Sequence, residues 1–91
     1  MRVTVEMSLY PLAPQPIDRI LAFIDTVRGD RRVEVVVNQL STQARGELRD
    51  VMEVLTSAIE RSFGAGGSQA LVLKILSADL PIAEPPVLER R

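Results

Sequence analysis

Hydrophobic and polar residues alternate at the start of the chain. In residues 2–9 every second side chain is apolar, namely Val3, Val5, Met7 and Leu9. A period of two is typical of a β-strand with one covered face. Residues 11–16, PLAPQP, hold three prolines and predict a loop.

Two later segments have the 3.6-residue period of an amphipathic helix. The first begins near Pro16, because proline is tolerated in the first turn, and Gly29-Asp30 ends it. Its apolar positions are Ile17, Ile20, Leu21, Ile24 and Val27. The second helix begins at Glu47 and ends at the glycine-rich residues 64–67.

Three further segments predict strands. Residues 33–38 are rich in β-branched side chains, residues 41–46 form a weaker strand, and residues 69–76 form the last. The resulting order β-α-β-β-α-β predicts a ferredoxin-like α+β sandwich: an antiparallel four-stranded sheet with two helices on one face. We expect one such domain over residues 1–79, followed by a proline-rich tail over residues 80–91. Right-handed crossovers place the first strand between the third and the fourth.

This topology brings distant polar residues to one edge of the sheet. The end of the first strand should lie beside the start of the third and the exit of the second. The candidate ligand-binding residues are therefore Ser8, Tyr10, Asn38, Gln39, Ser41 and Thr42. Such neutral donors and acceptors with one aromatic ring suit a flat heterocycle such as an aminopyrimidine. The alternative is that the Ser and Thr side chains only satisfy strand ends and turns.

The sheet face that the helices leave open mixes apolar and polar side chains. One interpretation is a sheet-to-sheet interface between copies, with Glu6 and Lys74 paired across adjacent strands. A chain this short buries only ~60–65% of its unfolded surface, so its size favours self-association. A cleft between packed sheets also leaves room for a ligand, and Glu6 would add an anionic partner for a cationic ring.

Composition excludes several function classes. The 91 residues include no cysteine and no histidine, which excludes disulfides, thiol nucleophiles and histidine catalysis. We therefore expect no enzymatic activity, no metal and no cofactor. The net charge of −1, with one Tyr and two Phe, lacks the basic footprint of a nucleic-acid binder. No apolar run approaches the ~18–20 residues of a membrane span, so we expect no membrane partner and a cytoplasmic location.

Several quoted segments together resemble one known family. The segments VTVEMSLYPL, STQARG before an acidic helix, AIERSF and LVLKIL are similar to the YkoF-like thiamine/hydroxymethylpyrimidine-binding proteins. The resemblance covers about residues 3–77. It implies a ferredoxin-like fold, dimers or tetramers formed by packing sheets, and binding of thiamine or its hydroxymethylpyrimidine moiety. The family pattern matches Ser8, Tyr10, Ser41 and Thr42, whereas Asn38 and Gln39 are added from the topology alone.

Two residues depart from the family pattern. Leu40 replaces an expected methionine, which conserves volume. Arg45 stands where a glutamate is common, and this charge reversal would change specificity if the acid held a cationic ligand.

Two functions follow as hypotheses. The first is non-catalytic binding of thiamine or hydroxymethylpyrimidine at the sheet interface, for carriage, storage or sensing. The alternative is a structural or regulatory protein-interaction module with no small-molecule ligand. An enzyme would need a metal or a partner to supply reactive groups that the chain lacks.

Overall fold

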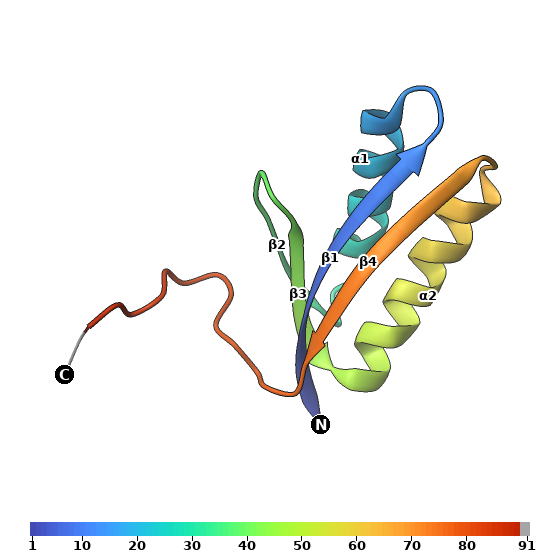
Figure 1. Ribbon diagram of the computed structural model, residues 1–91. Helices are drawn as coiled ribbons and strands as arrows, with labels where there is room; N and C mark the ends of the chain where they lie inside the picture. The colour runs from blue at the N-terminus through green and yellow to red at the C-terminus, as the bar shows by residue number, and fades with distance from the viewer. Residues whose placement is uncertain (90–91) are drawn as a thin grey trace.

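The computed structural model describes residues 1–89 and has the predicted element order. Its elements are β1 Arg2–Leu12, α1 Pro16–Arg28, β2 Glu34–Val37, β3 Thr42–Glu47, α2 Leu48–Gly64 and β4 Ser68–Leu76. The strands form one antiparallel sheet in the order β2-β3-β1-β4. Both helices cover the same face (Figure 1). The predicted ferredoxin-like α+β fold is confirmed, including the place of β1 between β3 and β4.

The core lies between the helices and the covered face of β1. All four alternating apolar residues of β1 are buried, as their period predicted. They pack in one cluster with Phe23 and Val27 of α1 and with Val51 and Leu55 of α2.

The buried stripe of α1 is rotated from the predicted one. Phe23 and Val27 are buried and Ile20 packs against them, whereas Ile17 and Leu21 are 64% and 53% exposed. The spacing i, i+3, i+7 from Ile20 defines one helix face, and residues 17 and 21 fall beside it. Ile17 and Leu21 therefore belong to the apolar period of the helix without facing the core.

β1 is longer than the alternation predicted, and it runs through Pro11 to Leu12. Its pairs with β4 continue to Leu12 and Ser68, whereas its pairs with β3 end at Met7 and Thr42. Pro11 therefore lies where the strand pairs on one side only, and a missing N–H group is tolerated at such an edge. The predicted loop begins at residue 13 instead of residue 11.

The segment after β4 docks on the open face of its own sheet. The Thr4 hydroxyl donates to the Ala78 carbonyl oxygen at 2.7 Å and accepts from the Leu80 N–H group at 2.9 Å. Asp79 pairs with Arg2 at 2.8 Å. These contacts leave Thr4 only 6% exposed, although it points away from the helices. The first part of the predicted tail is thus attached to the domain, and residues 90–91 lie outside the described residues.

Candidate functional site

A cleft lies where β3 stops pairing and β1 continues. Residues 8–12 of β1 have partners on β4 but none on β3. In an antiparallel ladder, alternate residues direct their N–H and C=O groups to opposite sides, so part of this segment presents free backbone groups toward the β2–β3 turn. The strand offset therefore produces both the space and a row of backbone donors and acceptors.

All six predicted ligand-binding residues line this cleft, which has a volume of about 260 Å³. They come from the end of β1 and from the turn between β2 and β3, as the topology predicted. The other wall is apolar and is supplied by α1, through Ile20, Phe23 and Ile24. This apolar wall was not predicted, although the 3.6-residue period of α1 could have placed Ile20 and Ile24 on the sheet side.

The Ser41 side chain is tied to a charged pair on the open face. Its hydroxyl donates to Glu6 Oε2 at 3.0 Å, and Lys74 Nζ lies 3.4 Å from Glu6 Oε1. Glu6 and Lys74 are direct neighbours in the register of β1 and β4. The predicted pairing of Glu6 with Lys74 is confirmed within the chain.

Asn38 organises the turn that carries the other cleft residues. Its Oδ1 atom accepts from the backbone N–H groups of Leu40 at 2.9 Å and Ser41 at 3.1 Å. Its own N–H group donates to the Ser41 carbonyl oxygen at 3.1 Å. Asn38 is therefore used structurally through its oxygen, while its Nδ2 group has no acceptor among residues 1–89.

The six residues do not share one face of the sheet. Ser8 and Tyr10 alternate with the core residues of β1 and therefore lie on the open face. Ser41 lies on the same face, where it bonds to Glu6. Thr42 instead pairs with Met7 on the helix-facing side and is 5% exposed. Neighbouring strand residues point to opposite faces, so the Thr42 side chain bounds the cleft from the core side. Tyr10 is 54% exposed and forms an accessible aromatic wall.

Arg45 contacts the segment after β4 and not the cleft. Its guanidinium pairs with Glu34 on β2 and donates to the Leu80 carbonyl oxygen at 2.7 Å. Its other acidic neighbour is Asp79, at 3.8 Å. Arg45 is not among the residues that line the cleft.

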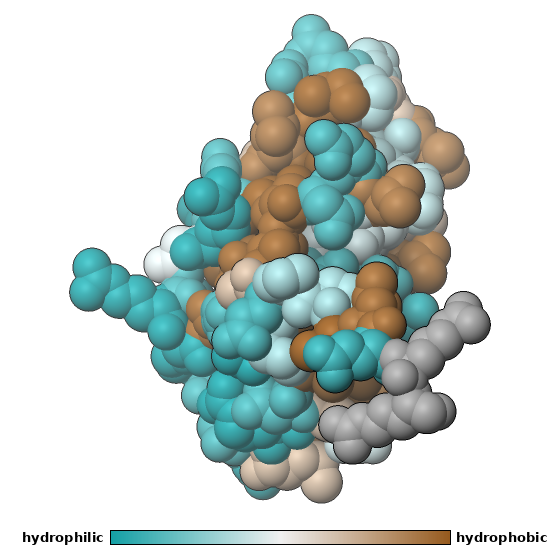
Figure 2. Space-filling model, turned by 90° about the vertical axis from the view of Figure 1, so that its left-hand side faces the viewer, coloured by the Kyte–Doolittle hydropathy of each residue, from teal (hydrophilic) through white to brown (hydrophobic). Residues whose placement is uncertain are grey.

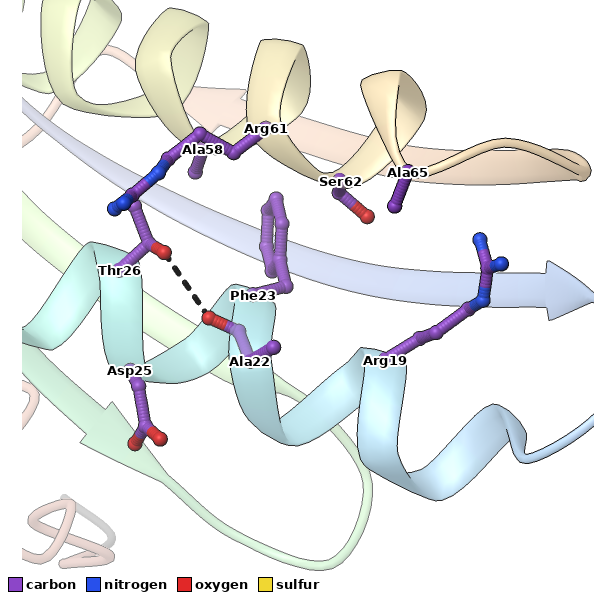
Figure 3. Close-up of a pocket in the computed structure, with 9 residues that line it drawn as sticks. All are labelled: Arg19, Ala22, Phe23, Asp25, Thr26, Ala58, Arg61, Ser62 and Ala65. Atoms are coloured by element: carbon purple, nitrogen blue, oxygen red, sulfur yellow. Dashed lines mark hydrogen bonds between the residues drawn. The ribbon is translucent and has the colours of Figure 1, made fainter.

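A second hollow runs between the two helices and was not predicted. It has a volume of about 420 Å³ and lies over Phe23, with Arg19 toward one end and Arg61 reaching toward Thr26 (Figure 3). The Arg19 guanidinium already donates to the Gly66 carbonyl oxygen, and the Thr26 hydroxyl donates to Ala22 within α1 at 3.0 Å. The Ser62 hydroxyl donates to the Gln69 side chain at 2.9 Å, so three of the five polar side chains that line the hollow are hydrogen-bonded within the protein.

The open face carries a mixed surface. Its exposed apolar side chains include Tyr10, Val72 and Leu76, beside the charged pair of Glu6 and Lys74. Seen from the side on which β2 and the tail lie, apolar and polar groups alternate over the molecule (Figure 2). This agrees with the mixed character that the sequence predicted for the face.

Residues 1–89 contain neither a metal-binding cluster nor a membrane-spanning helix. No group of three or more acidic side chains is arranged to hold a metal ion. Neither helix has the length and apolar character that crossing a membrane requires.

Comparison with known proteins places the fold. No family model and no curated protein matches the chain. Several solved structures resemble it, including the following three. A Streptococcus pneumoniae protein superposes with a TM-score of 0.79 at 22% identity, covering 88% of this chain and 90% of that one. A domain of unknown function (DUF77) from Bacillus cereus gives 0.74 at 24% identity, covering 90% and 84%.

The third is a Thermotoga maritima protein that has been provisionally assigned to thiamine biosynthesis or salvage. It superposes with a TM-score of 0.73 at 17% identity, covering 96% of this chain and 91% of that one. At these identities the likeness shows a shared fold over nearly the whole chain. It supports the resemblance described above at the level of the fold, and the YkoF-like family itself stays a prediction.

Proposed function

We propose that the protein binds a small pyrimidine compound, hydroxymethylpyrimidine or thiamine, in the cleft between β1 and the β2–β3 turn, without chemical turnover. The observation that carries the proposal is the convergence of six neutral polar residues, free strand-edge groups and an aromatic ring on one cleft. A flat heterocycle with donors and acceptors on its edge uses all three kinds of group.

The size of the cleft bears on the choice between the two ligands. Pockets for drug-sized ligands measure ~300–1,000 Å³, and the cleft has about 260 Å³. This volume favours the single pyrimidine ring, with the second ring of thiamine extending toward the open face. There the carboxylate of Glu6 would offer a partner to the positive charge of that ring.

The comparisons support the same ligand class. The Thermotoga maritima protein carries a thiamine-related assignment and covers nearly the whole chain. The family resemblance, which matches Ser8, Tyr10, Ser41 and Thr42, implies the same ligand class.

A carrier, storage or sensing role fits the residues of the cleft better than catalysis does. The chain has neither the histidine nor the cysteine that commonly activates or supplies a nucleophile. Its only lysine, Lys74, is paired with Glu6. We therefore propose binding alone.

Calorimetric titration with hydroxymethylpyrimidine, thiamine and thiamine phosphate tests the proposal. Binding of at least one compound near one site per chain, or per pair of chains, is expected. Tyr10→Ala should weaken it about tenfold, since an aromatic contact is worth ~0.5–1.5 kcal/mol beyond its buried area. Leu12→Ala is the matched control, because Leu12 is 73% exposed on the same strand and does not line the cleft. Folded protein that binds none of the three compounds would contradict the proposal.

The exposed apolar residues of the open face favour a second function, self-association. Val72 is 59% and Leu76 43% exposed on the outer side of β4. We propose that two sheets pack face to face there, forming a dimer or a tetramer. Light scattering should give at least twice the chain mass, and Val72→Glu should reduce it. If copies associate but no compound binds, the protein is an interaction module instead of a ligand carrier.

A further inference from the structure

We propose that Glu6 fixes the hydrogen-bond polarity of the cleft, so that Ser41 acts only as an acceptor toward a ligand. The site would then select a pyrimidine that carries an amino group over one that carries an acceptor at the same position. This inference rests on the proposed function and names the kind of ring edge that the cleft accepts.

The direction of one hydrogen bond carries the argument. An ionised carboxylate has no proton to donate, so the hydroxyl proton of Ser41 must point at Glu6 Oε2, 3.0 Å away. The lone pairs of Ser41 Oγ are then the part of the hydroxyl left for the cleft that Ser41 lines. A ligand atom placed beside Ser41 Oγ must donate a hydrogen bond to it.

Lys74 contacts the other carboxylate oxygen of Glu6 and leaves Oε2 to Ser41. Its Nζ atom lies 3.4 Å from Glu6 Oε1, the carboxylate oxygen that Ser41 does not use. Glu6 itself does not line the cleft, so it is a positioning residue that acts through Ser41.

Asn38 supplies the opposite polarity nearby. Its Oδ1 atom accepts from two backbone N–H groups, which fixes the orientation of the amide. The Nδ2 group, a donor only, is left for the cleft. The turn therefore presents an acceptor on Ser41 and a donor on Asn38, and an amino group beside a ring nitrogen complements both.

The test compares two pyrimidines that differ at one position. Hydroxymethylpyrimidine carries an amino group at C4, and its 4-methoxy analogue offers only an acceptor there. We expect the wild type to bind the amino compound at least about tenfold more tightly, the equivalent of one hydrogen bond and one repulsive contact. In Glu6→Gln, the amide can donate to Ser41, so the Ser41 hydroxyl is free to rotate. The ratio of the affinities for the amino and the methoxy compound should then fall toward one.

Two variants test whether the direction of the Ser41 hydrogen bond, and not the charge of the open face, sets the ratio of the two affinities. Lys74→Met keeps the Glu6 carboxylate, and both test compounds are neutral, so the ratio should stay high. Glu34→Gln changes another open-face carboxylate outside the cleft and should also leave the ratio unchanged. If Glu6→Gln does not fold, as judged by circular dichroism, Ser41→Ala carries the test and should lower the ratio in the same way.

The outcomes distinguish the two proposals. Failure of the wild type to bind either compound, thiamine or thiamine phosphate overturns the proposed function, and this inference with it. Equal binding of both pyrimidines by the wild type leaves the proposed function intact and overturns the inference. A high ratio that persists in Glu6→Gln and in Ser41→Ala also overturns it. A ratio that falls in Glu6→Gln and persists in Lys74→Met supports it.

Discussion

Arg45 on β3 donates a 2.7 Å hydrogen bond to the carbonyl oxygen of Leu80, which joins the sheet to the segment after β4. The same guanidinium pairs with Glu34 on the neighbouring strand. Arg45 is the residue that replaces the glutamate expected from the family resemblance. Because it holds the tail and does not line the cleft, we expect this charge reversal to affect tail attachment instead of ligand specificity.

Thr4→Val should detach the tail from the sheet. Valine has nearly the shape of threonine but loses the bonds to the Ala78 carbonyl oxygen and the Leu80 N–H group. Each such bond is worth ~0.5–1.5 kcal/mol net, so the free energy of unfolding should fall by about 1–2 kcal/mol. Urea denaturation measures this change, and faster hydrogen exchange at the Leu80 amide would locate it.

A threonine on a helix provides the matched control. Thr26→Val loses one exposed bond within α1, from the Thr26 hydroxyl to Ala22, and leaves the tail untouched. Its effect on unfolding should be within ~0.5 kcal/mol, as for most surface substitutions. Equal effects of Thr4→Val and Thr26→Val would mean that the tail contacts contribute nothing measurable.

Gly46→Ala should destabilise the fold because the new methyl group has no room. A Cβ atom at position 46 would lie 3.0 Å from the Arg32 carbonyl oxygen, which is backbone, and 3.5 Å from a Val33 methyl carbon. Overpacking of this kind typically costs ~1–3 kcal/mol. Thermal and urea unfolding of the purified variant measure the loss.

Gly64 is the contrasting position. A Cβ atom there meets nothing within 4 Å, and Gly64 closes α2. Gly64→Ala should therefore be neutral or stabilise by up to ~1 kcal/mol, because alanine has the higher helix propensity. If both alanine variants are equally stable, the close approach of Arg32 does not constrain position 46.

The core could be predicted from the sequence because its periodicity is local. Val3, Val5, Met7 and Leu9 alternate without interruption, and all are buried. The pairing of Glu6 with Lys74 followed from strand order alone, since both lie on the open face of adjacent strands. The convergence of Ser8 and Ser41 on one cleft followed in the same way.

Features set by strand length and by tertiary contact could not be predicted. Pro11 is typical of a loop. It is tolerated in β1 because the pairing with β3 ends at Met7, before Pro11 is reached. The strand register decides whether Ser41 or Thr42 faces the core, and a pattern of six polar residues does not fix that register. Docking of residues 78–80 depends on Thr4 and Arg45, both far from them in sequence.

Leu55→Ala should cost the most stability of the variants considered. Leu55 is 1% exposed and among the largest fully buried side chains. Truncating a buried leucine to alanine costs ~2–5 kcal/mol through lost burial and the cavity that remains. Leu40→Ala is the matched control, because Leu40 is 90% exposed and its loss should change the free energy of unfolding by less than ~0.5 kcal/mol. A small effect at Leu55 would mean that the core collapses around the cavity.

The loop that leads from α1 into β2 should make stability depend on pH. Asp30 accepts from the Arg32 side chain at 2.9 Å and from its backbone N–H group at 2.9 Å. These bonds, the side-chain bond foremost, hold the pKa of Asp30 below its ordinary value of 3.8. A carboxyl with a lowered folded pKa stabilises the fold above its unfolded pKa, and that stabilisation disappears as the pH falls through the folded pKa.

Asp30→Asn should therefore be less stable than the wild type at pH ~7, and the two should converge in acid, once the pH has fallen below the folded pKa of Asp30. Urea midpoints measured from pH ~7 to ~2 would show the wild type losing its advantage over this range. The double variant Asp30→Asn, Arg32→Gln tests the cause, because Asp30→Asn should have little effect once Arg32 is gone. A stability difference that stays constant with pH, or that persists in the Arg32→Gln background, would show that Asp30 acts through something other than its ionised contact with Arg32.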